Sequence, residues 1–159
     1  MKKINVGRTA AIAATLLALT SVSACSDGDD FMDYDAAANE YKEAAAELNL
    51  PKGAEGFPGL PKPAEATQYQ KGVGLVQAQY HWQCTWEKEW LTSQEEGGTR
   101  ADTALAELEK APKMKYMSKE HLDDQGRSDF LAYLDRAKLG DPSGFQMDYT
   151  ANCQRPEQN

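Results

Sequence analysis

The chain has 159 residues, of which 41% are hydrophobic, and its 17 basic and 25 acidic residues give a formal charge of -8. This acidity argues against nucleic acid as a partner, because phosphate groups require a basic surface. Two His and three Cys leave little room for a zinc site with several such ligands. We therefore expect neither a metal nor a cofactor.

The N-terminal 24 residues have the organisation of a secretory signal peptide. Lys2, Lys3 and Arg8 precede an uncharged stretch over residues 9–26, whose apolar centre spans residues 11–19. An uncleaved membrane anchor is the alternative, but 18 uncharged residues are barely enough to span a bilayer, and six of these are hydroxylic. We expect residues 1–24 to be removed as a signal peptide.

This signal ends in a motif with a known chemical consequence. The run Val22-Ser23-Ala24-Cys25 resembles the lipobox of bacterial lipoproteins at all four positions. The resemblance implies that Cys25 is alkylated with diacylglycerol, that cleavage precedes it, and that a further acyl chain such as palmitate is added to its amine. Removal of residues 1–24, which hold three basic and no acidic residues, leaves 135 residues with a formal charge of -11. We predict a protein held by lipid on the extracytoplasmic face of the cell membrane.

The mature chain divides into a short tether and one domain. Residues 25–32 are rich in Asp and are expected to be a solvated, lipid-anchored tether, followed by a single domain over residues 33–159. Asp33 can cap a helix that runs through Leu48. The next stretch, residues 51–74, holds four Pro and five Gly, which indicates an irregular connector. We expect it to lay Phe57 and Leu60 over the core; the alternative is that residues 58–61, a PxxP sequence, form a polyproline ligand.

The most aromatic stretch, residues 74–93, predicts the central helix. Trp82, Trp86 and Trp90 recur every four residues, and Val76, Tyr80 and Cys84 form a second row with the same spacing. Because both rows need burial, the helix is expected to lie inside a bundle. The Trp row leaves two interpretations open, namely core packing or an exposed aromatic platform for a ligand such as a cell-wall glycan.

Two further helices are predicted downstream. Thr99, in a capping box with Asp102, is expected to begin the first, which Pro112 ends. Ser128 is expected to cap the second, which Gly140 ends. Residues 145–153 are either one more helical turn or an extended return. The fold class is therefore mainly α: a small bundle of about four helices with a Pro/Gly-rich connector.

The cysteine count predicts one disulfide. With Cys25 assigned to lipid, Cys84 and Cys153 remain as an even pair in a secreted chain, so they are expected to be bonded to each other. The rival interpretation is a catalytic thiol, with His81 or His121 as its base.

The remaining candidates for chemistry are weak. His81 and Cys84 have the spacing of two metal ligands on a helix, but two ligands do not make a site. A glycosidase needs two carboxylates beside a groove, which Glu87, Glu89, Glu95 or Glu96 could supply near the Trp row. The chain has neither a nucleophile-elbow motif nor a phosphate-binding glycine loop. We therefore expect a protein without catalytic residues.

Outside the lipobox, residues 57–153 are similar to small uncharacterised lipoproteins of high-GC Gram-positive bacteria. The similarity rests on Phe57-Pro58, residues 82–87, residues 140–142 and Asn152-Cys153. It implies no particular activity, but it supports the pairing of Cys84 with Cys153. The sequence as a whole predicts a lipid-anchored binding or accessory module of the cell envelope that docks a larger envelope protein. The alternatives are a small glycan-binding protein or hydrolase and a metal-binding lipoprotein.

Overall fold

A computed structural model describes residues 30–154 of the protein. The signal peptide over residues 1–24, Cys25 and most of the predicted tether lie outside the described residues. Five α-helices lie within the described part: α1 (Tyr34–Ala46), α2 (Val73–Ser93), α3 (Thr99–Leu108), α4 (Asp124–Lys138) and α5 (Ser143–Asp148). The prediction of a mainly helical bundle is confirmed. No helix in residues 30–154 has both the length and the apolar composition needed to cross a membrane.

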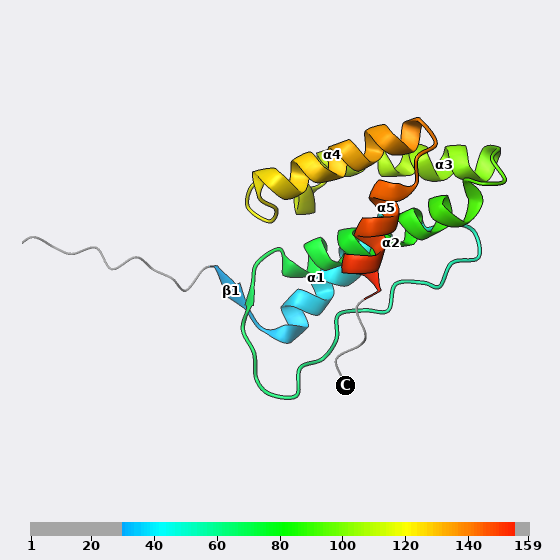
Figure 1. The fold of residues 1–159 in the computed structure, drawn as a ribbon. Coiled ribbons are helices and arrows are strands. Elements are labelled where there is room, and N and C mark those ends of the chain that lie inside the picture. The colour runs from blue at the N-terminus through cyan, green and yellow to red at the C-terminus, as the bar shows by residue number, and fades with distance from the viewer. Residues whose placement is uncertain (1–29, 155–159) are drawn as a thin grey trace, which may run out of the picture.

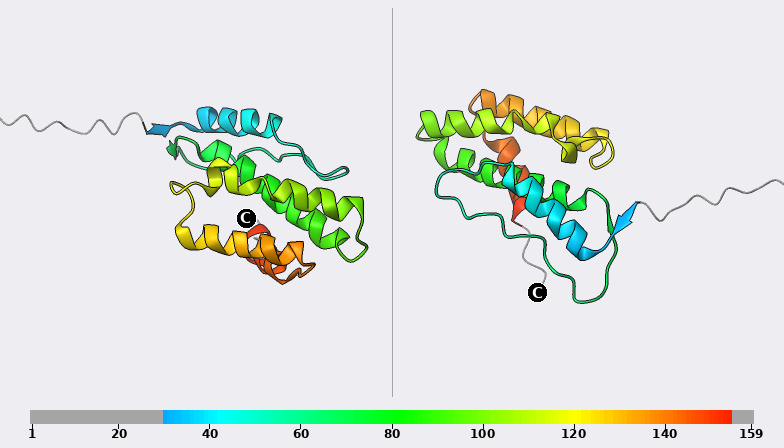
Figure 2. Two further views of the ribbon diagram at one scale, coloured as in Figure 1. Left: turned by 90° about the horizontal axis from the view of Figure 1, so that it is seen from above. Right: turned by 180° about the vertical axis from the view of Figure 1, so that it is seen from behind.

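The helices form layers around α2. Figures 1 and 2 show α2 and α3 lying between α1 on one side and α4 on the other, while α5 crosses back toward α2. Side chains from both faces of α2 are buried or packed against the core, as the two apolar rows of its sequence predicted. The core is completed by residues of the other elements: Leu108 of α3, Tyr116 and Met117 of the 3-10 turn η3 (Lys115–Met117), Phe130 and Leu134 of α4, and Phe145 of α5.

α1 and α2 run in the same direction, so the chain between them must return along the bundle (Figure 1). The second end of this connector is fixed by a short antiparallel pair, in which β2 (Tyr69–Gln70) lies against β1 (Phe31–Met32), the strand that precedes α1. Phe57 packs edge-on against Tyr41 of α1, and the Tyr34 hydroxyl donates to the Leu60 carbonyl. The expectation that the connector lays Phe57 over the core is confirmed, whereas Leu60 is half-buried and is held through its carbonyl. The last two residues of the predicted tether belong to the folded part.

The start of α2 approaches α1 very closely, and Gly74 makes this approach feasible. A Cβ atom at Gly74 would lie 2.2 Å from the Ala37 carbonyl oxygen. Two residues before Gly74, the Gly72 amide donates to both carboxylate oxygens of Glu40, at 3.2 and 3.0 Å. Gly72 precedes α2 with a left-handed backbone, and no side chain caps the start of the helix. The hydrogen bond to Glu40 holds this end of α2 in place of a side-chain cap.

Three helix ends differ from the predictions, each for a local reason. α3 starts after Gly98, whose φ of 83° only glycine adopts readily, so Thr99 is already helical and the predicted capping box does not form. α3 then ends at Leu108, and Pro112 lies in a separate 3-10 turn, η2 (Ala111–Lys113). α4 begins one turn before Ser128, because Asp123 accepts from the Gly126 amide at 2.7 Å and caps it.

Candidate functional site

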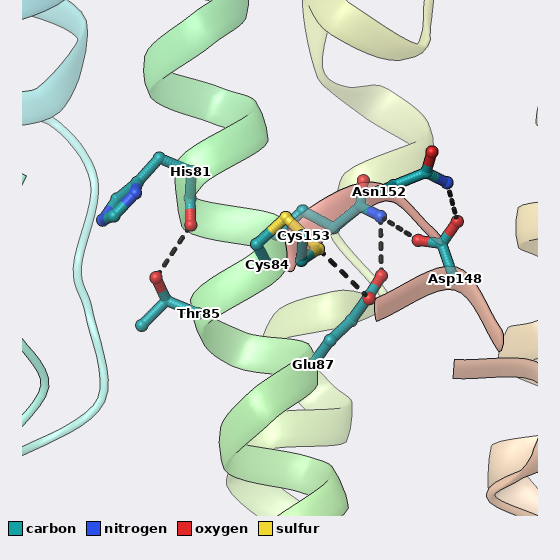
Figure 3. Close-up of a disulfide and its surroundings, with 8 residues drawn as sticks. His81, Cys84, Thr85, Glu87, Asp148, Asn152 and Cys153 are labelled. Atoms are coloured by element: carbon teal, nitrogen blue, oxygen red, sulfur yellow. Dashed lines mark hydrogen bonds between the residues drawn. A yellow bond between two sulfur atoms is a disulfide. The ribbon is translucent and has the colours of Figure 1, made fainter. Parts of the chain in front are cut away.

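The predicted disulfide is present. Cys84 in the middle of α2 is bonded to Cys153 in η4 (Tyr149–Cys153), the π-helical turn that follows α5. Their Cα atoms are 5.5 Å apart, a normal separation for this bond. The bond fastens the end of the described chain to the central helix, as Figure 3 shows. Because both sulfurs are in the disulfide, the alternative of a catalytic thiol is wrong, and Cys84 is not available as a metal ligand beside His81.

The three tryptophans belong to the core. Trp82, Trp86 and Trp90 are at most 5% exposed, and Trp90 packs edge-on against Phe145 with ring centroids 5.6 Å apart. The Trp86 indole N–H donates to the Asn49 carbonyl at 2.9 Å. Of the two interpretations left open by the sequence, core packing is correct. The exposed aromatic platform is wrong, because the bundle covers both faces of α2.

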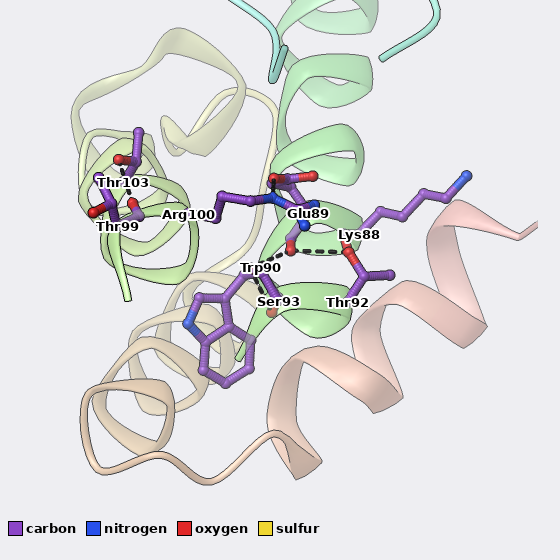
Figure 4. A network of polar contacts seen from close by, with 8 residues as sticks. All are labelled: Lys88, Glu89, Trp90, Thr92, Ser93, Thr99, Arg100 and Thr103. Atoms are coloured by element: carbon purple, nitrogen blue, oxygen red, sulfur yellow. Dashed lines mark hydrogen bonds and ion pairs between the residues drawn. The ribbon is translucent and has the colours of Figure 1, made fainter. Parts of the chain in front are cut away.

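The glutamates that the hydrolase alternative would require do not share a groove. Glu87 is completely buried, whereas Glu95 and Glu96 are exposed in the turn after α2. Glu89 accepts a hydrogen bond from Arg100 Nε at 2.8 Å (Figure 4). Glu89 and Arg100 line an open cleft of about 590 Å³ beside residues 51–55 of the connector, and Glu87 does not reach it.

A pair of carboxyl groups lies next to the disulfide. Gln83 Nε2 donates to Glu87 Oε1 at 2.6 Å and to Asp148 Oδ2 at 2.9 Å, so one amide links α2 to α5. Asn152 Nδ2 donates to Asp148 Oδ1 at 2.7 Å, and Cys153 Sγ lies 3.9 Å from Glu87 Oε2. Figure 3 shows Glu87 pointing from α2 toward Asp148. The Gln83 amide therefore bridges the two carboxyl groups, and the Asn152 amide holds Asp148 from its own turn.

Burial raises the pKa of Glu87 well above its ordinary value, and the Asp148 carboxylate beside it raises this pKa further. The hydrogen bond from Gln83 acts in the opposite direction but is the smallest contribution. Burial and the Asp148 charge both favour the protonated, neutral form of the Glu87 carboxyl group.

The two histidines lie in different places. His81 packs its ring on Phe57 with centroids 5.2 Å apart and faces the connector, and burial lowers its pKa. His121 lies in the turn that follows η3. Within residues 30–154, no three His, Cys, Asp or Glu side chains are grouped as metal ligands would be. The metal-binding alternative would have required His81 and His121 to converge, which they do not.

A second pocket, of about 300 Å³, lies between α2, η3, α4 and the C-terminal turn. We call it the tyrosine pocket. Its apolar wall is formed by the side chains of four aromatic residues together with Val76 and Leu122; the four are Tyr80, Tyr116, Phe130 and Tyr133. Its polar lining residues are Gln83, His121, Asp129, Asp148 and Asn152. The carboxyl pair thus borders this pocket through Asp148.

Two residues that line the tyrosine pocket each carry a buried polar atom without a hydrogen-bond partner among the described residues. These are the Tyr116 hydroxyl oxygen and His121 Nε2. The Tyr116 side chain is only 5% exposed, and its backbone N–H is fixed by Gln79 Oε1 at 3.0 Å. Burial raises the Tyr116 pKa well above its ordinary value, with the charges of Glu87 and Asp148 as the next causes, so the phenol is neutral. A buried polar group without a partner costs about 1–3 kcal/mol, which a bound hydrogen-bonding group would recover.

Sequence reasoning missed most of this pocket. Tyr116 and Asp148 carry no motif, and they meet α2 only through the tertiary fold. One available signal was the pair Gln83 and Glu87, which have helical i, i+4 spacing among apolar residues on a helix expected to be buried on both sides.

Comparisons with protein-family models, with curated proteins and with solved structures gave no match. The functional conclusion therefore depends on the residues and geometry described above.

Proposed function

We propose that the protein is a lipid-anchored binding module of the cell envelope, which performs no chemistry itself and acts as an accessory to a larger envelope protein. The membrane half of this proposal rests on the signal-like residues 1–24 and on the lipobox cysteine, Cys25. A diacylglycerol on Cys25 with a further acyl chain would hold the protein stably, whereas one chain would bind only reversibly. The described domain begins at residue 30, so it would lie close to the membrane surface.

The observation that carries the binding half is the tyrosine pocket. Its volume of about 300 Å³ is at the small end of the range for ligand sites, and it combines an apolar wall with a few polar groups. Two of these polar groups, on Tyr116 and His121, have no hydrogen-bond partner among residues 30–154, although His121 Nε2 lies 3.9 Å from Glu120 Oε2. Native proteins pair nearly all their buried polar atoms, so two such atoms on residues that line one pocket favour a ligand that completes their hydrogen bonds.

The reactive side chains are bonded, buried or paired, which supports a function without catalysis. Cys84 and Cys153 are bonded to each other, Glu87 is out of reach of solvent, and Glu89 is paired with Arg100. A nucleophile or a general base needs access to its substrate. These groups instead fix the position of the C-terminal turn and of α3.

A ligand-observed NMR screen of small polar fragments tests the binding function. We expect hits whose signals are lost when Val76→Phe fills the pocket. The matched control is Val73→Phe, one turn earlier on α2, because Val73 does not line the pocket. A screen in which no fragment distinguishes Val76→Phe from Val73→Phe would overturn the proposed function.

A further inference from the structure

The charged side chains that line the tyrosine pocket are acidic. Asp129 and Asp148 both line it, and no Lys or Arg is among its lining residues. Behind Asp148 lies the buried Glu87, and the Gln83 amide donates to both carboxyl groups. Among the described residues, the Asp148 carboxylate accepts hydrogen bonds only from the neutral amides of Gln83 and Asn152. The site therefore favours a cation over a neutral molecule or an anion.

The aromatic wall favours the same kind of ligand. Tyr80 and Tyr116 meet edge-on with ring centroids 6.4 Å apart, and Phe130 and Tyr133 approach from α4. Aromatic faces attract ammonium groups, and this attraction is greater where water is excluded. Val76 and Leu122 add aliphatic surface, which suits a short hydrocarbon chain.

The unpartnered atoms decide between kinds of cation. The Tyr116 hydroxyl oxygen can accept a hydrogen bond, and so can His121 Nε2 when the imidazole proton is on Nδ1. Asp148, which borders the same pocket, is an acceptor as well. Three acceptors around one pocket match a group with several N–H donors, whereas a quaternary ammonium has none.

We propose that the tyrosine pocket binds a small organic cation that carries a primary or secondary ammonium group on a short hydrocarbon chain. Its ammonium lies among Asp148, Tyr116 and His121, and its chain lies against Val76, Leu122 and Phe130. This inference rests on the proposed binding function and specifies the chemical class of the ligand.

Isothermal titration calorimetry on the full chain, purified from membranes in mild detergent, tests the inference with n-butylammonium as the probe. Neutral 1-butanol and anionic butyrate are the matched comparison ligands. We expect n-butylammonium to bind and the other two not to bind. Equal binding of 1-butanol or butyrate would overturn the cation inference, although the screen with Val76→Phe would still support a binding pocket.

Three variants complete the test. Tyr116→Phe removes only the unpartnered oxygen, so we expect about tenfold weaker binding with unchanged or higher thermal stability. Asp148→Asn should also weaken binding about tenfold or more, whereas Asp135→Asn, which removes an exposed carboxylate of α4, should not. If n-butylammonium binds equally to the wild type, Tyr116→Phe and Asp148→Asn, the assignment is wrong. A loss of binding in Asp135→Asn as large as that in Asp148→Asn would contradict it too.

Discussion

The buried carboxyl pair makes a sharp prediction about stability and pH. In the unfolded chain Glu87 has its ordinary pKa near 4.5, whereas in the folded protein burial and Asp148 raise it well above that value. Between these two pKa values the folded protein holds a proton that the unfolded chain has released. Folding therefore takes up a proton, and the free energy of unfolding falls as pH rises. The stabilisation is fully present below about pH 4.5 and is lost as pH rises through the folded pKa of Glu87.

The magnitude follows from the uptake of one proton. One pH unit corresponds to about 1.4 kcal/mol for each proton taken up on folding, so the window above pH 4.5 should show this slope. Glu87→Gln mimics the protonated acid, because its carbonyl can accept from Gln83 and its amide can donate to Asp148. The variant should lose the slope and become more stable than the wild type at neutral pH.

Urea denaturation at pH 5.5, 6.5 and 7.5, followed by the fluorescence of the buried tryptophans, measures this difference. His81 contributes with the opposite sign below about pH 6.5, because burial lowers its pKa, but this contribution is common to both proteins and cancels. Glu95→Gln, at an exposed glutamate, is the control and should keep the wild-type slope. If wild type and Glu87→Gln have parallel pH profiles, the reasoning about the carboxyl pair is refuted.

Three further predictions concern the fold and its anchor. Gly74→Ala should lower the free energy of unfolding by about 3 kcal/mol, because its Cβ would lie 2.2 Å from backbone of α1; Gly56→Ala, with open space around it, should change the urea midpoint little. The double variant Cys84→Ala/Cys153→Ala opens a loop with a sequence separation of 69, so its free energy of unfolding should fall by about 4 kcal/mol in the same assay. An unchanged urea midpoint would mean that the disulfide does not stabilise the fold. Intact mass spectrometry of the membrane fraction should find Cys25 as the lipid-bearing N-terminal residue, and Cys25→Ala should retain residues 1–24 and gain no lipid. A free Cys25 thiol in the wild-type protein would disprove the anchor.

The local patterns of the sequence were sufficient for the helices and the disulfide. Rows of apolar residues at i, i+4 spacing predicted α2 and its burial on both faces, and the even pair of cysteines predicted the bond between Cys84 and Cys153. The errors at the starts of α3 and α4 have one cause. A residue earlier in the chain than the predicted cap begins each helix: Gly98 turns the backbone into α3 through its positive φ, and Asp123 caps α4 with its side chain.

The candidate site could not be predicted in the same way. Gln83 and Glu87 are neighbours on α2, but Asp148 comes from α5, and Tyr116 comes from a 3-10 turn without a recognisable pattern. Whether two carboxyl groups meet, or a phenol hydroxyl lacks a hydrogen-bond partner, depends on which elements pack together. The sequence also left the role of the Trp row open, because the same spacing suits a core and a platform; burial on all sides resolved it.

The central claim is that the tyrosine pocket is a binding site for a small organic ammonium. The most direct test is the measurement of intermolecular NOEs between the methylene protons of n-butylammonium and the full chain. We expect contacts to the ring protons of Tyr116 and Phe130 and to the methyl groups of Val76. Contacts confined to the open cleft near Lys88 and Arg100, or no contacts at all, would contradict the claim.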